Sequence, residues 1–348
     1  MTPDHRSGIE LLCPLCARPL ASTGAAGRSL ACGGGHRFDA AKQGYVNLLT
    51  GRGTGFTEDT ADMVAARAGF LAAGHYAPLA RALAGEALRA AGRLDPERAV
   101  RVLDAGAGTG YYLGAVLSAL RSGTQDGDAA EARAGSGPSL AAPAGHDAGA
   151  RPGSGPSPAE LVRDGDDPAA QAGRPASGVA LDISRYAMRR AARLEGVRAL
   201  VWDVWRRLPL PDGGADLLLN VFAPRNGAEF HRVLADDGTL LVVTPLPGHL
   251  REAAEPLGLL GIAPDKEASV AGGLGPGWTQ TGVREVRFTL RLDEADAARL
   301  ALMGPAGHHA DAAVFAERAA HGVPESVTAA FRLQAFAKDA GSQHRPQG

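Results

Sequence analysis

The sequence predicts an α/β fold in which a mostly parallel sheet follows a small metal-binding module. Short apolar strands alternate with helical patterns, and the first of these strands runs into a glycine-rich turn. All three cysteines lie near the amino terminus. We therefore divide the chain into a metal-binding module (1–56), a helical linker (57–98), an α/β domain in two parts (99–120 and 179–340) and an insertion between those parts (121–178).

The insertion at 121–178 differs in composition from the rest of the chain. Ala, Gly, Pro and Ser make up 38 of its 58 residues, and aromatic residues are absent. Because such a stretch cannot bury enough apolar surface to offset the entropy lost on ordering, we expect it to be disordered. It carries a net charge of −3, whereas the whole 348-residue chain carries −2 and residues 1–56 carry +3. The bulk charge therefore hides a basic amino-terminal part, which suits a nucleic-acid partner.

The cysteines form a pattern typical of a zinc site. The sequence has neither a run of 18 apolar residues nor an apolar signal-peptide stretch, so we expect a cytoplasmic protein with no membrane contact. In that compartment an odd number of clustered cysteines indicates metal rather than disulfides. Cys13-x-x-Cys16 and Cys32-Gly-Gly-Gly-His36 supply three thiolates and an imidazole for a tetrahedral, structural zinc ion, one per chain. The alternative is a chance group of buried thiols.

Residues 57–98 are predicted to form two helices. Met63 and Phe70 belong to a first group of apolar residues at helical spacing, and Leu79 and Leu83 belong to a second. A glycine separates the two groups.

The glycine-rich turn is the main candidate for ligand binding. A strand at 100–103 leads through Asp104 into Gly106-Ala-Gly108-Thr-Gly110, and a helix follows. These glycines let the backbone approach a bound ligand closely. Dinucleotide-binding folds share such a turn, but Asp104 is placed to face the ammonium group of a methionine moiety. The turn therefore favours S-adenosylmethionine.

Two further acidic residues follow predicted strands. Asp182 ends the strand at 179–181 and could accept hydrogen bonds from ribose hydroxyls; the insertion lengthens the usual separation of about 20 residues from the turn. Asp203 follows the strand at 199–201 and could bind the adenine amino group. Each of these carboxylates, like Asp104, could instead be a loop residue or a helix cap.

The remaining elements complete the sheet. Strands are expected at 215–222, 239–243, 283–292 and 328–336, and helices at 184–194, 228–234 and 294–303. The last strand, helix and strand fit an antiparallel edge. Asn220 and Phe222 end one of the strands, where they could hold a base or serve as a turn former and a core residue. His249 follows another strand at the same rim, where a lone histidine is also a common surface residue.

Together these motifs resemble the large-subunit ribosomal RNA guanine-N1 methyltransferases, a family that includes the enzymes by which producers of tylosin and mycinamicin resist their own drugs. The matching motifs are C-P-L-C at 13–16, the Cys32/His36 pair, F-D-x-A-K-x-G-Y-V-N-L-L at 38–49, M-x-x-A-R-x-x-F-L-x-A-G-H-Y at 63–76, D-x-G-x-G-x-G-Y-Y at 104–112, A-P at 223–224 and T-P-x-P-x-H-L at 244–250. The resemblance implies a class I Rossmann-like S-adenosylmethionine-dependent methyltransferase sheet with an amino-terminal zinc ribbon or knuckle.

The resemblance also implies roles for particular residues. The implied zinc ligands are Cys13, Cys16, Cys32 and His36. The residues implied to contact S-adenosylmethionine are Tyr76, Gly108, Thr109 and His249. The resemblance further implies that the helical linker at 57–98 contributes to the cofactor pocket.

The implied reaction is methyl transfer to N1 of a guanine in hairpin 35 of 23S ribosomal RNA, at position 748 rather than 745, with a contribution to macrolide resistance. RNA phosphates would be gripped by the basic residues of the zinc module, Arg18, Arg28, Arg37 and Lys42. Phe222 or Tyr111 could stack on the target base. No residue stands out as a catalytic base, and Asp182 and Asp203 are equal candidates for accepting the N1 proton. The sequence is compatible with a homodimer but does not require one.

Two other functions are open at this stage: a small-molecule methyltransferase, and a non-catalytic zinc RNA-binding protein with a vestigial cofactor fold. A small substrate needs neither a zinc module nor a basic amino terminus. The intact turn at 104–110 argues against a vestigial fold. The insertion and a loosely matching carboxyl-terminal part depart from the family, which leaves the choice of nucleotide open.

Overall fold

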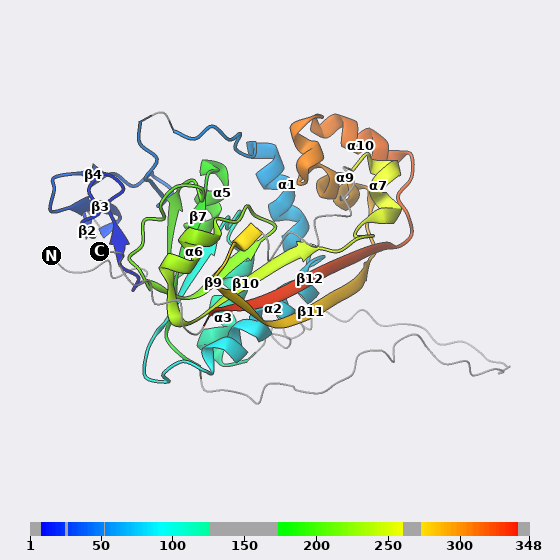
Figure 1. Ribbon diagram of the computed structural model, residues 1–348. Helices are drawn as coiled ribbons and strands as arrows, with labels where there is room; N and C mark the ends of the chain where they lie inside the picture. The colour runs from blue at the N-terminus through cyan, green and yellow to red at the C-terminus, as the bar shows by residue number, and fades with distance from the viewer. Residues whose placement is uncertain (1–7, 25–26, 52, 125–172, 260–272, 340–348) are drawn as a thin grey trace, which may run out of the picture.

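The structure, a computed structural model, describes residues 8–24, 27–51, 53–124, 173–259 and 273–339 (Figure 1). Residues 125–172, most of the predicted insertion, lie outside the described part of the chain, so their expected disorder stays a prediction. Within the described part, no helix is both long enough and apolar enough to cross a membrane.

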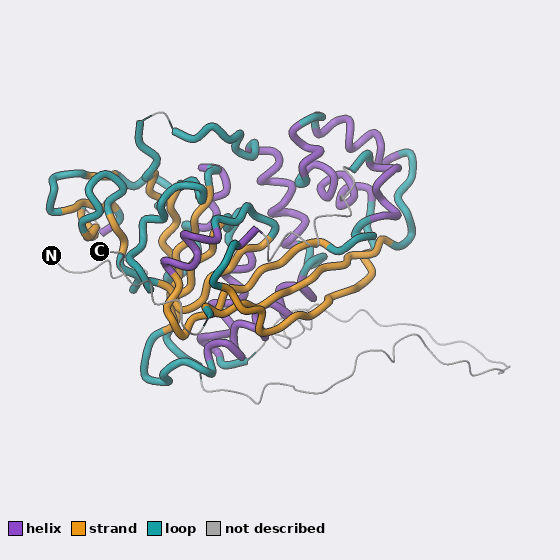
Figure 2. The backbone as a smooth tube through the Cα atoms, in the orientation of Figure 1, coloured by secondary structure: helices purple, strands orange, loops and turns teal. Residues whose placement is uncertain are grey.

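An eight-stranded sheet forms the centre of the molecule, in the order β11-β12-β10-β9-β6-β7-β8-β5 (Figures 1 and 2). Neighbouring strands from β10 to β5 are parallel, whereas β12 runs antiparallel to both β10 and β11. The strands are β5 (Val46–Asn47), β6 (Val100–Ala105), β7 (Ala176–Asp182), β8 (Val197–Val201), β9 (Ala215–Val221), β10 (Leu234–Pro245), β11 (Trp278–Leu290) and β12 (Val327–Lys338). This order confirms the predicted class I Rossmann-like methyltransferase fold and its antiparallel edge.

Helices cover the sheet, and a helical cluster extends it. One face packs against α2 (Ala77–Ala91), α3 (Tyr111–Ser122) and α5 (Arg185–Ala191), and the other against α6 (Gly227–Val233) and the amino-terminal module. Neighbouring strand residues point to opposite faces, so Val102 joins one hydrophobic core and Leu103 the other. The cluster, near the end of β10 and the start of β12, consists of α1 (Ala61–Ala72), α7 (Arg251–Leu257), α9 (Glu294–Leu302) and α10 (Ala312–Ala320).

The amino-terminal module is built into the sheet domain. Its own antiparallel sheet consists of β1 (Leu11–Leu12), β2 (Pro19–Thr23), β3 (Ser29–Cys32) and β4 (Arg37–Phe38). The next strand, β5, adds to the large sheet beside β8. Arg198 of β8, only 1% exposed, donates to the carbonyl oxygens of Arg28 (2.9 Å) and Gly27 (3.2 Å). Leu11 and Leu30 share one core with Leu103, so the predicted boundary at 56 does not separate two cores.

Some elements differ from the sequence prediction. Helix α3 ends at Ser122 and β7 begins at Ala176, so regular structure enters the predicted insertion from both sides. Ala176 pairs with Val100 of β6. The first residues of β7 are small and do not by themselves indicate a strand, so it is the pairing with β6 that holds them in one. Helices α7 and α10 are absent from the prediction. Helix α10 buries only Phe315 and Ala319, too few residues to produce an apolar periodicity.

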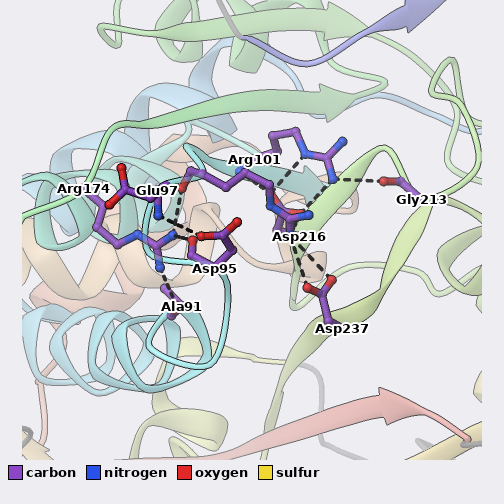
Figure 3. A network of polar contacts seen from close by, with 9 residues as sticks. Ala91, Asp95, Glu97, Arg101, Arg174, Gly213, Asp216 and Asp237 are labelled. Carbon is purple, nitrogen blue, oxygen red and sulfur yellow. Dashed lines mark hydrogen bonds and ion pairs between the residues drawn. The ribbon is translucent and has the colours of Figure 1, made fainter.

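A buried carboxylate ties strands β6 and β9 together at their amino ends (Figure 3). Asp216 is fully buried and accepts hydrogen bonds from the backbone N, Nε and Nη2 of Arg101 at 2.9, 3.0 and 2.7 Å. Arg98 Nη2 adds a fourth donor at 2.8 Å. Nearby, Arg174 donates to the carbonyl oxygens of Ala91 (2.6 Å) and Arg98 (2.8 Å). This end of the sheet, opposite the glycine-rich turn, is therefore fastened by charge-assisted hydrogen bonds.

Candidate metal centre and cofactor site

The three cysteines and His36 converge on one point. Cys13 and Cys16 lie between β1 and β2, Cys32 ends β3, and His36 directly precedes β4. Their ligand atoms all lie within 4.8 Å of one another. Cys16 Sγ lies 3.5 Å from Cys32 Sγ, and His36 Nδ1 lies 3.4 Å from Cys32 Sγ. A tetrahedron of zinc–sulfur bonds of about 2.3 Å has edges of about 3.8 Å, so the donor set fits zinc in both chemistry and spacing.

Gly34 keeps the inside of this cluster clear. A Cβ at this position would lie 3.2 Å from Cys16 Sγ, 3.5 Å from Cys32 Sγ and 3.6 Å from His36 Nδ1. A side chain there would crowd Cys16 Sγ and would be in van der Waals contact with two more of the four ligand atoms. At Gly33, by contrast, a Cβ would meet nothing within 4 Å. The glycine run thus provides the space that a bound ion requires.

The glycine-rich turn lies where ligands bind open α/β sheets, at the carboxyl ends of strands where the strand order reverses. The backbone N–H groups of Gly106 and Ala107 both donate to the carbonyl oxygen of Leu181 at 2.9 Å, which fixes the turn to the end of β7. A Cβ on Gly106 would collide with Ala223, so the turn cannot carry a side chain there. Thr109, predicted to contact the cofactor, lies in this turn just before α3.

Asp104 lies near the carboxyl end of β6 and is 1% exposed. Its Oδ1 atom is buried and has no hydrogen-bond partner among the described residues. Burial, and after it the charge of Asp182, raises the pKa of Asp104 to about 8. An unpaired buried carboxylate oxygen is costly, and an ammonium group would supply the missing donor. Asp104 therefore fits the methionine end of S-adenosylmethionine.

Asp182 and Asp203 end or follow β7 and β8 at the same rim. Asp182 accepts hydrogen bonds from the backbone N–H groups of Gly108 (2.9 Å) and Ser184 (2.8 Å). Asp203 accepts from the hydroxyl of Thr54 (2.8 Å) and from a backbone N–H of its own loop (3.0 Å). Both carboxylates thus hold loops at this rim, and carboxylate oxygens have lone pairs left for ribose or adenine donors. The contact from Thr54 was not foreseen from sequence.

Tyr76 and His249 meet at the far side of the rim. Tyr76, the N-cap residue of α2, has its Oη 3.4 Å from His249 Nε2. The backbone N–H of Ala330 donates to His249 Nδ1 at 3.1 Å, which assigns the ring proton to Nε2. Burial lowers the pKa of His249 to about 4, so this pair is neutral at pH 7. Such a pair can hydrogen-bond a ligand without adding charge.

A chain of aromatic rings connects this pair to the glycine-rich turn. Ring centroids are separated by 6.1 Å between Tyr112 and Phe222, 5.4 Å between Phe222 and Phe331, and 4.5 Å between Phe331 and His249. Phe222 has φ +55° and is 44% exposed. A bulky residue in the left-handed region indicates local strain, which often accompanies function. The exposure contradicts the alternative that Phe222 is a core residue.

Asn220 supports the loop that carries Phe222. It is fully buried, and its Nδ2 donates to the carbonyl oxygens of Ala105 (3.1 Å) and Pro224 (2.9 Å). This favours the turn-forming role over direct contact with a base. Sequence reasoning missed one neighbour of the turn altogether: Arg67 of α1, whose Nη1 lies 3.9 Å from a Cβ built on Gly108. The motif at 63–76 contains it, but nothing in that motif distinguishes it from a surface arginine.

Solved structures that this chain matches include a methyltransferase of Bacillus halodurans (12% identity, TM-score 0.40, covering 73% of this chain and 97% of that one) and a geranyl diphosphate methyltransferase in complex with S-adenosylmethionine (14% identity, TM-score 0.35, covering 74% and 85%). Because these TM-scores are low, the fold assignment rests on the strand order.

Sequence relatives are much closer. The zinc-ribbon family described as RlmA, N-terminal, matches residues 11–51. A 23S rRNA (guanine-N1)-methyltransferase of Micromonospora griseorubida is 41% identical over 339 residues, which are 94% of this chain and 97% of that protein. The 23S rRNA (guanine(748)-N1)-methyltransferase of Streptomyces fradiae is 41% identical over 324 residues, covering 91% and 94%. Since this likeness runs through the metal centre, the glycine-rich turn and the sheet alike, the chain belongs to the family of 23S rRNA (guanine-N1)-methyltransferases.

Proposed function

We propose that this protein transfers a methyl group from S-adenosylmethionine to N1 of guanine 748, in hairpin 35 of 23S ribosomal RNA, in the cytoplasm. The observation that carries the proposal is the 41% identity, over 91% of the chain, to the Streptomyces fradiae relative named for that position. The orphaned carboxylate of Asp104 beside an intact glycine-rich turn supports cofactor binding. One structural zinc ion per chain, held by Cys13, Cys16, Cys32 and His36, belongs to the same proposal.

The residues of the rim position the two reactants. Asp104 holds an ammonium group, and Asp182 and Asp203 hold the ribose and adenine at the ends of β7 and β8. When bound, S-adenosylmethionine supplies an electrophilic methyl group on a sulfonium. In-line transfer depends mainly on alignment, which a rigid rim provides. Phe222, half-exposed and held by a strained backbone, offers a ring on which a guanine lifted out of its hairpin can stack.

The N1 proton leaves as the new carbon–nitrogen bond forms. Asp182 and Asp203 already accept hydrogen bonds from backbone N–H groups, which favours them as residues that hold the pocket over proton acceptors. Loss of the proton to solvent water therefore suits this site better than transfer to either carboxylate.

The zinc module provides the RNA contacts. Its four predicted phosphate-binding side chains are all exposed: Arg18, Arg28, Arg37 and Lys42. Figure 1 shows the module at one side of the molecule, with its strands apart from the helical cluster. Arg198 of β8 hydrogen-bonds the module and so fixes it to the sheet. An RNA hairpin bound to the module would therefore have a fixed orientation relative to the rim.

Primer extension tests the target. A hairpin 35 transcript is treated with protein and S-adenosylmethionine, and a methyl on N1 should stop reverse transcriptase one nucleotide before position 748, because it removes a Watson–Crick donor. A transcript carrying adenine at 748 and the Asp104→Asn variant are the controls. A stop before 745 would refute the position, and the absence of a stop on any 23S transcript would refute the function. Macrolide susceptibility of cells with and without the gene then tests the proposed contribution to resistance.

A further inference from the structure

Helix α1 places a guanidinium group over the glycine-rich turn. Arg67 Nη1 lies 3.9 Å from a Cβ built on Gly108, and apart from the two residues next to Gly108 in the chain, no other atom of the described residues comes within 4 Å of that position. A Cβ on Gly106 would instead collide with Ala223, at 2.3 Å from its Cβ. Arg67 is therefore the positively charged side chain at this turn, where the carboxylate of Asp182 also accepts a hydrogen bond from the backbone N–H of Gly108 at 2.9 Å.

This guanidinium is held in place from two directions. Its Nη1 pairs with Asp59 at 2.5 Å, and its Nη2 donates to the carbonyl oxygen of Met303, at the end of α9, at 2.7 Å. Asp59 is fixed in turn by His308 Nε2 at 3.3 Å and by the hydroxyl of Ser184, which donates to its carbonyl oxygen at 3.3 Å. An arginine has five N–H donors in a planar fork, so these contacts leave donors for a ligand.

The charge of Arg67 acts on the pocket itself. It lowers the pKa of Asp182 and of Tyr112 against the larger effect of burial, which raises both. The hydroxyl of Tyr112 is buried, and no residue in the described part of the chain forms a hydrogen bond with it. Arg67 and Asp182 thus both lie at Gly108, and the orphaned hydroxyl on the first turn of α3 is close enough for the charge of Arg67 to act on its pKa.

The predicted cofactor residues account for only one end of a methionine moiety. Asp104 provides a negative charge for the ammonium group, whereas Tyr76 and His249 are neutral and Asp182 and Asp203 are acidic. A methionine moiety is a zwitterion, so its carboxylate needs a cation or several donors on the side away from Asp104.

We propose that Arg67 binds the carboxylate of the methionine portion of S-adenosylmethionine, so that the cofactor's amino acid end is held between Arg67 and Asp104. The inference rests on the proposed function, since it assigns a residue to the same cofactor site. It gives the fixed guanidinium a ligand of matching charge and planar shape. Tyr112 provides a hydroxyl donor beside it.

Calorimetric titration with two ligands tests this role. S-Adenosylhomocysteine has both the ammonium and the carboxylate, and its decarboxylated analogue, which is also a thioether, lacks only the carboxylate. In Arg67→Gln we expect about a 30-fold loss of affinity for S-adenosylhomocysteine, the scale of a charge-assisted pair, and no change for the decarboxylated ligand. Arg67→Lys keeps the charge without the fork and should recover part of the loss.

Arg299→Gln is the matched control. Arg299 belongs to the same contact between α1 and α9, with its Nε 3.2 Å from a Cβ built on Gly69, but it faces Gly69 rather than the turn. Its removal should leave both affinities unchanged. Equal losses of both ligands in Arg67→Gln would show that the residue only docks α1, and an unchanged affinity for S-adenosylhomocysteine would show that it makes no contact; either result overturns the proposal. Wild-type protein that binds neither ligand would instead refute the cofactor site, and with it the proposed function.

Discussion

The two ends of the parallel sheet each bury an aspartate, and they treat it in opposite ways. At the amino end, Asp216 accepts four hydrogen bonds from Arg98 and Arg101. At the carboxyl end, Asp104 is as well buried, yet its Oδ1 has no donor and burial raises its pKa to about 8. Asp216 on β9 and Asp104 on β6 belong to adjacent, hydrogen-bonded strands, so the contrast arises from side-chain neighbours rather than from the fold. At the amino end, the hydrogen-bonding groups of the buried carboxylate are satisfied in the free protein. At the carboxyl end, a buried carboxylate oxygen lacks a donor, and a bound ligand can supply it.

The largest effect on stability should come from the metal centre, because the zinc module packs against one face of the sheet. Cys16→Ser removes one zinc ligand, and we expect loss of zinc and a destabilisation of several kcal/mol, since Leu11 and Leu30 share a core with the sheet. Elemental analysis and thermal unfolding measure the two effects. Gly34→Ala should weaken zinc binding to a lesser degree, whereas Gly33→Ala, where a Cβ meets nothing, should not. Freshly purified wild-type protein without zinc would contradict the assignment.

Asp216→Asn tests the amino end. Removing the charge leaves the guanidinium groups of Arg98 and Arg101 without their anion; because these groups are 39% and 27% exposed, we expect a cost of about 1 to 3 kcal/mol, the scale of charge-assisted hydrogen bonds. Urea denaturation measures the free energy of unfolding. The affinity of the remaining folded protein for S-adenosylhomocysteine should not change, because this network lies away from the rim. If Asp216→Asn instead kept its stability and lost affinity for S-adenosylhomocysteine, the amino end would be the ligand-binding end, contrary to the roles assigned here.

Asp104→Asn is the matched change at the carboxyl end, and its effects should be the opposite. An acid whose folded pKa is raised above its unfolded value loses stability as the pH rises from the unfolded value toward the folded one. For Asp104 this interval runs from about 4 to about 8, so the substitution should raise the stability at pH 8. It should also remove most of the affinity for S-adenosylhomocysteine.

The same pKa predicts how ligand affinity depends on pH. Binding an ammonium group requires ionised Asp104, so the affinity for S-adenosylhomocysteine should rise by up to about tenfold per pH unit below pH 8 and level off near it. Calorimetry between pH 6 and 8 checks this, and proton release on binding can be read from the dependence on buffer ionisation enthalpy. In Asp104→Asn the slope should disappear. A flat profile in the wild type would mean that Asp104 is ionised in the free protein or does not bind the ammonium group.

This contrast also explains what could be predicted from sequence. The zinc ligands and Asp104 lie close in sequence to the motifs that define them, so their spacing carries the information. The role of Arg67 is not visible in its local sequence. Arg67 is held at the turn by the packing of α1 on α9, which lies more than 200 residues later in the chain. The pairing of Asp216 with Arg101 likewise depends on two strands meeting. The start of β7 at Ala176 was missed because its small residues are held by a neighbouring strand rather than by their own preference.

The smallest effect should come from deleting residues 125–172. The two ends of this segment are anchored beside the amino end of the sheet, where Arg174 contacts Ala91 and Arg98. The backbone N–H of Arg174 donates to the carbonyl oxygen of Leu120 at 2.8 Å, and a Cβ on Gly173 would collide with the carbonyl oxygen of Arg121. The anchors are therefore adjacent, so a short Gly/Ser linker can replace the segment without moving α3 or β7.

For this deletion we expect the free energy of unfolding to stay within about 0.5 kcal/mol of the wild-type value, because changing the length of such a connection changes its closure entropy only slowly. The affinity for S-adenosylhomocysteine should also be unchanged. Urea denaturation and calorimetry measure both, and methylation of the hairpin transcript is the decisive comparison. A folded deletion variant that binds the ligand but no longer methylates RNA would contradict this prediction. It would give the segment a role in RNA binding and place part of the RNA-binding surface at the amino end of the sheet.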